Sequence, residues 1–303
     1  MTSFLWLGRR AMIFYILIYL IAHFTVDYGR INFGVKVKRL NRYMPREFSS
    51  LLTLEEGGKK VEKETLEQYV RFYRVVVELF PERADARSLL GFCEFYMGNP
   101  IAAVSQYQKA AELKPHIFWF FYNPAVIYFK GGQYEEALKY FQEALAADPQ
   151  ETTDYIFNSK VIHRVFFDNI PSIADELRRR LIIGYQNAYI LMVAIYYQSK
   201  DYPQTLQMIQ NAINEKIGRQ DVFYYYAGLV YIQLNQYKNA QMAFQKSLAL
   251  NPDFFESAFF LAETSRVLGD QKMHQEASRK ADSLEASKTK HIPHLSQISL
   301  RLF

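Results

Sequence analysis

The fold of this chain is decided by the stretch LLGFCEFYMGNPIAAVSQYQKAAELKP, residues 89–115, and by the way its pattern returns. Apolar residues recur at spacings of three and four on both sides of Gly98, which is the pattern of two amphipathic helices joined by a turn. Similar stretches run from Val126 to Pro149 and from Tyr224 to Pro252. The sequence therefore predicts repeated helical hairpins.

Prolines place these hairpins on a fixed period. Pro81, Pro115 and Pro149 are 34 residues apart, and Pro252 lies three such periods plus one residue further on. Because proline cannot continue a helix, each one marks the end of a second helix. One hairpin cannot bury its own apolar face, whereas several stacked hairpins can. We assign the one inserted residue to the segment around Gly218.

In this register the chain resembles the tetratricopeptide repeat family. The residues that carry the resemblance are the small Ala103, Ala137 and Ala240, the large Tyr107, Phe141, Ile209 and Phe244 four positions later, the small Ala110, Ala144 and Ala212, the first-helix Gly91 and Gly228, and the turn residues Gly98, Gly132 and Gly269. The resemblance covers about residues 60–285. It implies an all-α, right-handed superhelix of helix-turn-helix repeats that binds other proteins.

The register also divides the chain. We expect a membrane anchor at 1–28, a basic linker at 29–59, the superhelix at 60–285 and a tail at 286–303. The expected repeats lie near 50–83 (partial) and at 84–117, 118–151, 152–185 (divergent), 186–220, 221–254 and 255–285. The divergent segment keeps the length of a repeat but loses its pattern, since Asp175 stands where a large apolar residue belongs.

The aromatic run FWFFYNP, residues 118–124, puts a proline inside the first helix of a repeat. Two outcomes are open. Asn123 could cap a helix that begins late, with Pro124 in its first turn, and we favour this outcome. Alternatively, the helix begins normally and loses one backbone hydrogen bond at Pro124.

The family's groove positions, on the concave face of the superhelix, are aromatic and aliphatic in this chain. We expect them to lie outside the helix-helix core and to hold an amphipathic helix or an extended apolar segment of a partner. The candidate groove residues are Phe92, Phe95, Tyr96, Trp119, Tyr122, Phe129, Tyr197 and Tyr225. The alternative is that these rings pack within the superhelix or against the chain's own tail, HIPHLSQISLRLF at 291–303.

Residues 11–26, AMIFYILIYLIAHFTV, contain no Asp, Glu, Lys or Arg, and with the preceding FLWL they approach the about 20 residues that span a bilayer. No small-x-small cleavage pattern follows, so we expect an uncleaved anchor in a bacterial inner membrane rather than a signal peptide. A short basic N-terminus before an apolar run favours export of the repeats, whereas the positive-inside rule alone favours a cytoplasmic domain.

Positive charge is concentrated beside this segment. Residues 1–46 hold eight basic residues and one acidic residue, so the rest of the chain is mildly acidic and we exclude nucleic acid as a partner. The basic residues that we expect at the membrane surface are Arg30, Lys36, Lys38, Arg39, Arg42 and Arg46. Each such side chain near an anionic leaflet contributes roughly 1 kcal/mol.

No sequence motif indicates catalysis. A Gly-rich phosphate loop, an HExxH pair and paired cysteines are absent, and the histidines are scattered, so we expect no enzyme, no cofactor and no metal site. Arg178, Arg179 and Arg180 could form a charged helix end or a docking patch for an acidic partner. We predict a membrane-anchored scaffold that recruits or stabilises protein subunits of a membrane complex. The alternative is a receptor that binds a solute or an envelope polymer in the same groove.

Overall fold

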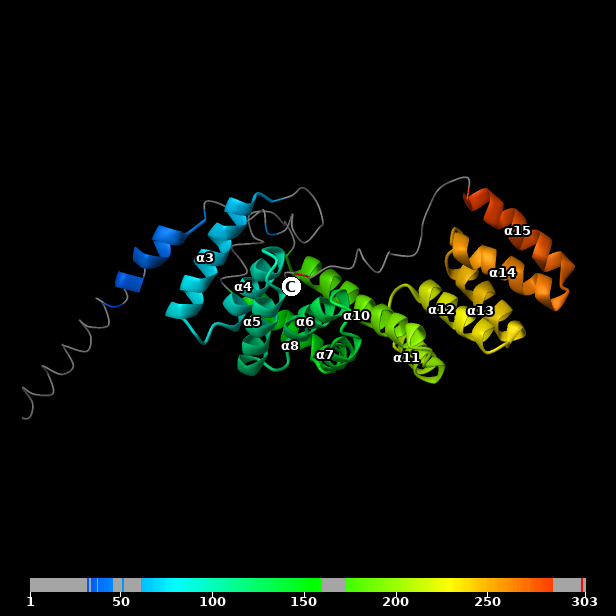
Figure 1. The fold of residues 1–303 in the computed structure, drawn as a ribbon, viewed down its shortest axis with the longest axis horizontal. Coiled ribbons are helices and arrows are strands. Elements are labelled where there is room, and N and C mark those ends of the chain that lie inside the picture. The colour runs from blue at the N-terminus through cyan, green and yellow to red at the C-terminus, as the bar shows by residue number, and fades with distance from the viewer. Residues whose placement is uncertain are drawn as a thin grey trace, which may run out of the picture.

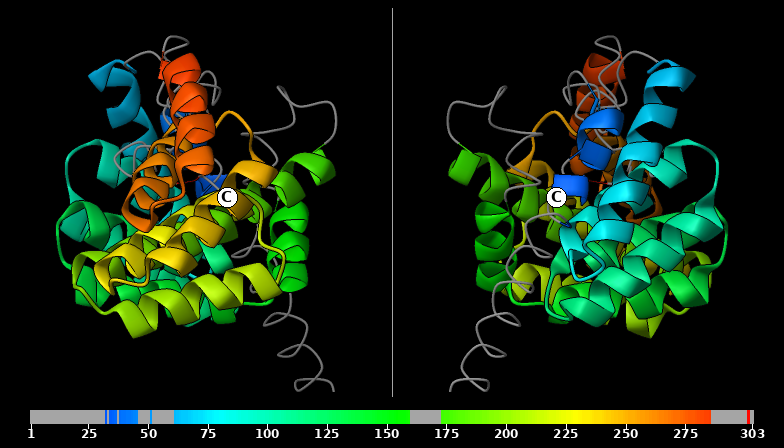
Figure 2. Two further views of the ribbon diagram at one scale, coloured as in Figure 1. Left: turned by 90° about the vertical axis from the view of Figure 1, so that its right-hand side faces the viewer. Right: turned by 90° about the vertical axis from the view of Figure 1, so that its left-hand side faces the viewer.

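The computed structural model describes residues 32, 34–36, 38–45, 51, 61–159, 173–285 and 301. Within these ranges every regular element is a helix. The helices lie side by side in an elongated array that runs from α3 (Lys63–Leu79) at one end to α15 (Gln271–Glu285) at the other (Figure 1). In the end-on views the helix direction changes along the array, as it does when helical hairpins stack with a twist (Figure 2).

Four helix pairs occupy the clearest repeats of the sequence. They are α4 (Ala84–Tyr96) with α5 (Pro100–Leu113), α6 (Phe118–Lys130) with α7 (Tyr134–Ala146), α12 (Gln220–Gln233) with α13 (Tyr237–Leu250), and α14 (Phe255–Leu268) with α15. In each pair the two helices pack closely on one another, and each of the first three pairs contacts the next helix along the chain. The array is thus built from local hairpins, as the 34-residue period predicts.

The helix ends follow from proline and glycine. α3, α5 and α13 end two residues before Pro81, Pro115 and Pro252 respectively, and α7 ends three residues before Pro149. These prolines lack the N–H that a continuing helix needs. Between the helices of a pair, Gly98 and Gly132 have φ of +87° and +74°, a left-handed conformation that glycine adopts without steric cost.

The segment 152–185 differs from the expected divergent repeat. α8 (Pro149–Asn158) is short, and α10 (Ile173–Gln198) then continues for 26 residues through the position where a repeat boundary is expected, between 185 and 186. No proline interrupts this run. α10 pairs with α11 (Tyr202–Asn214) and also packs against α7, so the α10–α11 hairpin stacks directly on the α6–α7 hairpin.

Two main apolar cores lie along the array. The first is formed by residues from Leu51 to Ile195, and the second by residues from Tyr189 to Ala277. α10 contributes to both cores, with Leu191 in the first and Ile190 in the second. This long helix therefore joins the two halves of the molecule.

Among the described helices, none combines the length and the hydropathy that a membrane crossing needs. The anchor predicted at 11–26 lies outside the described residues. In the predicted linker, the described residues between 32 and 43 are helical.

Candidate polypeptide-binding site

The candidate site is centred on Asn123, in the middle of α6. Its side chain is polar yet completely buried, with 0% of its surface exposed. The backbone N–H of Arg301 donates to Oδ1 of Asn123 at 2.9 Å, and Nδ2 of Asn123 donates to the carbonyl oxygen of Arg301 at 2.7 Å. One carboxamide thus satisfies both backbone groups of one residue, as a neighbouring β-strand would.

α6 presents Asn123 in this way because the helix begins at Phe118, before the proline. The late start, with Asn123 as the cap, is therefore wrong, and the alternative with Pro124 inside the helix is correct. Pro124 has no N–H for the carbonyl of Phe120, so the helix gives up one backbone bond. Asn123 is left inside the helix, where its side chain is available for contacts with another segment.

The aromatic run before Asn123 forms a buried cluster between α6 and α10. Phe118 stacks on Tyr122 and on Tyr185 with ring centroids 5.3 Å and 4.5 Å apart, and Trp119 meets Tyr122 edge to face at 5.5 Å. From α10, the Nδ2 atom of Asn187 donates to the Tyr122 hydroxyl at 3.4 Å. These rings hold α10 against α6 and fix the position of Asn123.

Four of the eight predicted groove residues are core residues, which corrects the expectation that they lie outside the helix-helix core. They are Phe92, Trp119, Tyr122 and Tyr225, with exposures of 1%, 1%, 0% and 6%. For Trp119 and Tyr122 the cause is α10, which covers the face that a uniform stack of repeats would leave open. These four rings pack within the array, which is the alternative to partner binding that the sequence left open.

The other four groove candidates, Phe95, Tyr96, Phe129 and Tyr197, are half-buried. The first three pack against the first core, and Phe95 meets Tyr96 edge to face at 5.4 Å. Tyr197 instead contacts the ring of Tyr226 in the second half of the array, at 6.2 Å. The structure therefore groups Phe95, Tyr96 and Phe129 on one core and places Tyr197 with the other.

Two of the predicted membrane-surface residues contact the end of α3. Lys36 Nζ donates to the carbonyl of Leu79 at 3.2 Å, and Arg39 forms two bonds to the Glu78 carboxylate at 2.6 and 2.7 Å. Cations are favourable at this end of a helix because its last carbonyls carry partial negative charge. Lys38 and Arg42 are exposed, whereas Arg30 and Arg46 lie outside the described residues.

The arginine run of α10 forms ion pairs within the helix. Arg178 pairs with Asp175 at 3.3 Å and Arg179 with Glu176 at 2.7 Å, both one turn back along α10. Arg180 is 5% exposed and also bonds Glu176, at 2.7 Å. The run is thus neither at a helix end nor presented as a single basic patch.

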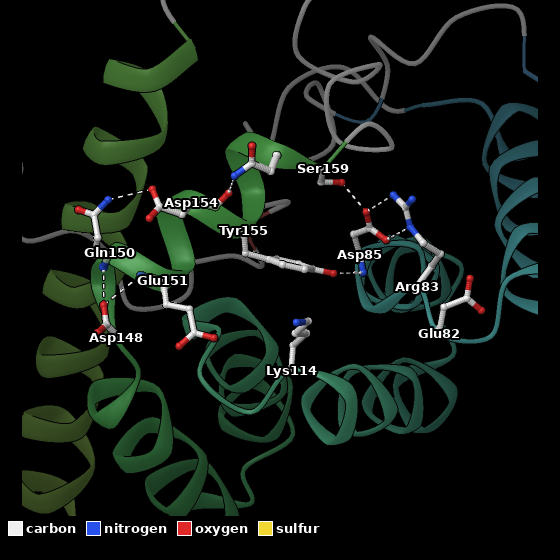
Figure 3. A pocket seen from close by; sticks show the side chains of 11 residues that line it. Glu82, Arg83, Asp85, Lys114, Asp148, Gln150, Glu151, Asp154, Tyr155 and Ser159 are labelled. Atoms are coloured by element: carbon white, nitrogen blue, oxygen red, sulfur yellow. Dashed lines mark hydrogen bonds and ion pairs between the residues drawn. The ribbon is translucent and has the colours of Figure 1, made fainter.

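A polar cavity of about 670 Å³ lies between the start of α4, the end of α5 and α8 (Figure 3). Asp85 in its wall is 2% exposed and accepts two bonds from Arg83, at 2.9 and 2.6 Å, and one from the Ser159 hydroxyl. Its own backbone N–H donates to the Tyr155 hydroxyl at 3.0 Å. Burial, together with the charge of Asp85, raises the pKa of that phenol. These bonds fasten α8 to α4, so the cluster has a structural role.

Metal ligation and cysteine reactivity can both be assessed in the part of the chain that the structure describes. In those ranges no group of three His, Cys, Asp or Glu side chains could hold a metal ion. Cys93 is fully buried, and burial with the neighbouring charge of Glu94 raises the pKa of its thiol, which keeps it protonated and unreactive.

Asn123 is not among the binding residues predicted from the sequence, because an Asn before Pro at this position favours a helix cap. The feature of the sequence that indicates this contact is a single amide side chain within an otherwise apolar helix. Asn123 is polar and lies between aromatic and aliphatic residues in FWFFYNPAVIYF, residues 118–129. A buried amide in such a helix must find hydrogen-bond partners outside its own helix face.

Comparison with known proteins supports the repeat assignment. Residues 119–151 and 223–254 each match a model of the tetratricopeptide repeat. The TPR repeat-containing protein YpiA of Bacillus subtilis is 24% identical over 214 residues, which are 70% of this chain and 49% of that protein. The TPR repeat-containing protein MJ1428 of Methanocaldococcus jannaschii is 20% identical over 237 residues, 75% of this chain and 37% of that protein. This chain therefore spans less than half the length of either relative.

Among solved structures, the assembly chaperone of RpL4 (Acl4, residues 1–338) superposes with a TM-score of 0.50 at 16% identity, covering 85% of this chain and 92% of the chaperone. At this identity the likeness concerns the fold alone. Two segments of this chain therefore resemble tetratricopeptide repeats (TPRs), and the stacked helix pairs around them have the corresponding architecture.

Proposed function

We propose that this chain is a TPR protein and a non-enzymatic scaffold that holds an extended polypeptide segment of a partner at Asn123. The observation that carries the proposal is the pair of hydrogen bonds between the Asn123 carboxamide and both backbone groups of a single residue. Every polypeptide offers these two groups, whereas the neighbouring side chains set the preference for one sequence. TPR proteins are typically non-catalytic and bind protein or peptide partners, which agrees with this reading.

Half-buried rings packed against the first core give the partner apolar surface. Phe95, Tyr96 and Phe129 are accessible enough to gain burial when a segment binds, and aromatic residues dominate the energetics of many interfaces. Further along the array, Tyr197 is half-buried and Phe259 is 46% exposed, so a longer partner could extend its contacts towards α14. The curvature of stacked repeats favours long concave contacts of this kind.

We further propose that residues 1–28 anchor the repeats in a bacterial inner membrane, and that the recruited chains are subunits of a membrane complex. The uncharged run at 11–26 supports the anchor. The exposed Lys38 and Arg42 are suited to an anionic surface, while Lys36 and Arg39 support α3. We place the repeats on the extracytoplasmic side and expect lipid contact through the N-terminal anchor, with no nucleic acid partner.

Photo-crosslinking tests the scaffold function in the full-length protein in its membrane. A photoreactive phenylalanine analogue at Phe129 should form a covalent product with one defined segment of another polypeptide. The matched control is the same analogue at Leu250, which is 53% exposed at the end of α13. It should not form that product. If Phe129 yields no product with another chain, even after the C-terminal segment is released, the scaffold function is wrong.

A further inference from the structure

We propose that the chain's own C-terminal segment, residues 291–303, is the resident occupant of the Asn123 site, and that a partner must displace it. This inference rests on the proposed function, because it names what fills the same site before a partner arrives. It starts from the two hydrogen bonds, which join positions 178 residues apart in the sequence. The Asn123 side chain is fully buried when Arg301 is bound there, so the same bonds cannot be offered to a partner at the same time.

The contact brings a residue near the C-terminus, Arg301, back to a helix in the first half of the array. α15 ends at Glu285 at the far end of the array from α6, as Figure 1 shows, yet Arg301 bonds α6. The 15 residues between Glu285 and Arg301 can extend over roughly 50 Å. Because these bonds engage main-chain atoms, the segment satisfies the same recognition that we propose for a partner.

The sequence of the segment fits an extended ligand. In ISLRLF, residues 298–303, the aliphatic Ile298, Leu300 and Leu302 alternate with Ser299 and Arg301. In an extended chain successive side chains point to opposite sides, so such a segment can place one apolar face on a surface. Residues 291–303 contain no Asp or Glu, whereas the chain beyond residue 46 is mildly acidic. The sequence of the segment therefore favours an extended ligand with apolar side chains on one side and without negative charge.

Tethering makes even a weak contact effective. A covalent tether of 15 residues corresponds to an effective concentration of about 1 mM for the end that it carries. If the free segment binds with a Kd of about 0.1 mM, the tethered one fills the site in about ten molecules of eleven, and a partner's apparent affinity falls about tenfold. A partner therefore displaces the segment only if it binds more tightly than the segment or is concentrated at the membrane.

The test uses the full-length chain with a protease site inserted between Ser287 and Lys288. The protein is folded and then cut, the released segment is removed, and circular dichroism checks that the helices persist. A fluorescent peptide, HIPHLSQISLRLF, is titrated by anisotropy into cut and uncut protein. We expect saturable binding to the cut protein and at least tenfold weaker binding to the uncut protein. If the peptide does not bind cut protein up to about 1 mM, the inference fails, although the Phe129 crosslink to a partner could still stand.

Matched variants locate the peptide at Asn123. Asn123→Leu keeps the side-chain size and removes both hydrogen bonds, so it should weaken binding to the cut protein at least tenfold. Asn251→Leu removes another amide, one that bonds Asp221 in the second half of the array rather than Arg301, and should leave peptide binding within twofold. A peptide N-methylated at Arg301 lacks the N–H that donates to Asn123, and it should also bind at least tenfold more weakly. This peptide tests the site even if Asn123→Leu does not fold.

Two outcomes would overturn the inference at this stage. Equal binding of the N-methylated and unmodified peptides would show that the segment does not occupy Asn123. Blocking of the uncut protein that disappears on dilution would show that the segment comes from a second copy of the chain. A block that is independent of protein concentration supports an intramolecular occupant.

Discussion

Gly184 lies on α10 where no side chain fits. A β-carbon there would stand 2.7 Å from ring atoms of both Phe118 and Trp119. Both rings are almost completely buried and already packed against neighbours, so they have little freedom to move. The glycine therefore permits the close approach of α10 to α6 that buries the aromatic run.

We predict that Gly184→Ala destabilises the protein by about 1–3 kcal/mol, the usual cost of overpacking a core. Gly131→Ala is the control, since its β-carbon would meet its nearest neighbours at 3.5 Å and its φ is −81°. The measurement is urea unfolding followed by circular dichroism. Equal midpoints for Gly184→Ala and the wild type would mean that α10 does not approach Phe118 and Trp119 closely enough to exclude a β-carbon.

At this scale the sequence predicted the packing within a repeat but not the packing between distant segments. Ala103, Tyr107, Ala137 and Phe141 are each 0% exposed, in agreement with the positions that the family resemblance implies. These residues meet inside one hairpin or between adjacent ones, so a local pattern describes them. Trp119 is covered by a helix about 65 residues later, and no periodicity in the sequence reports that contact.

At the scale of elements, two helices begin with the same arrangement of an arginine and a buried aspartate. At the start of α4, Arg83 donates to Asp85 at 2.6 Å. At the start of α12, Arg219 donates two hydrogen bonds to Asp221, at 3.0 and 2.9 Å. Asn251, at the end of α13, also donates to Asp221 at 2.9 Å. Asp221 therefore ties the beginning of one helix pair to its end.

The pKa of Asp221 makes this tie dependent on pH. Burial alone would raise the pKa of the carboxyl group, but the hydrogen bonds from Arg219 and Asn251 outweigh it and hold the pKa below its usual value. A group whose folded-state pKa is lowered stabilises the fold above its unfolded-state pKa, about 3.9 for aspartate. That contribution is lost as the pH falls through the folded-state pKa.

We expect Asp221→Asn to cost about 1–3 kcal/mol at pH 7, and the difference from wild type to shrink below about pH 4. Asp253→Asn is the control, because Asp253 is exposed and lies 3.6 Å from Lys280 in a surface pair, which contributes little. Thermal or urea unfolding of the three proteins between pH 3 and pH 7 provides the comparison. A difference between Asp221→Asn and wild type that stays constant over this range contradicts the assignment.

Element boundaries were predictable where a breaker residue stands and unpredictable elsewhere. α5 and α13 each end two residues before a proline, Pro115 and Pro252, because the effect of proline on a helix is local. The 34-residue register requires a boundary near residue 185, but no proline stands there and α10 continues. A period describes only the average repeat, so it cannot identify the place where two successive helices fuse.

At the scale of the whole molecule, the two cores meet in a narrow region. α10 supplies residues to both, and Leu145 and Met208 are half-buried side chains that pack against both. In a repeat array each unit contacts only its neighbours, so distant units open independently unless a shared element couples them. The coupling between the two halves should therefore depend on α10.

Ile190 and Leu191 allow this coupling to be measured, because they are adjacent on α10, both 0% exposed, and packed in different cores. Truncation of either to alanine should cost about 2–4 kcal/mol in the core that it leaves. We predict that Ile190→Ala lowers the opening free energy of amides in α12–α15 while α4–α7 change by less than about 0.5 kcal/mol, and that Leu191→Ala gives the reverse. Native-state hydrogen exchange with mass spectrometry resolves the two groups of helices. If each variant lowers protection equally in both groups, the array opens as one cooperative unit, and α10 acts as a continuous spine rather than as the border between two cores.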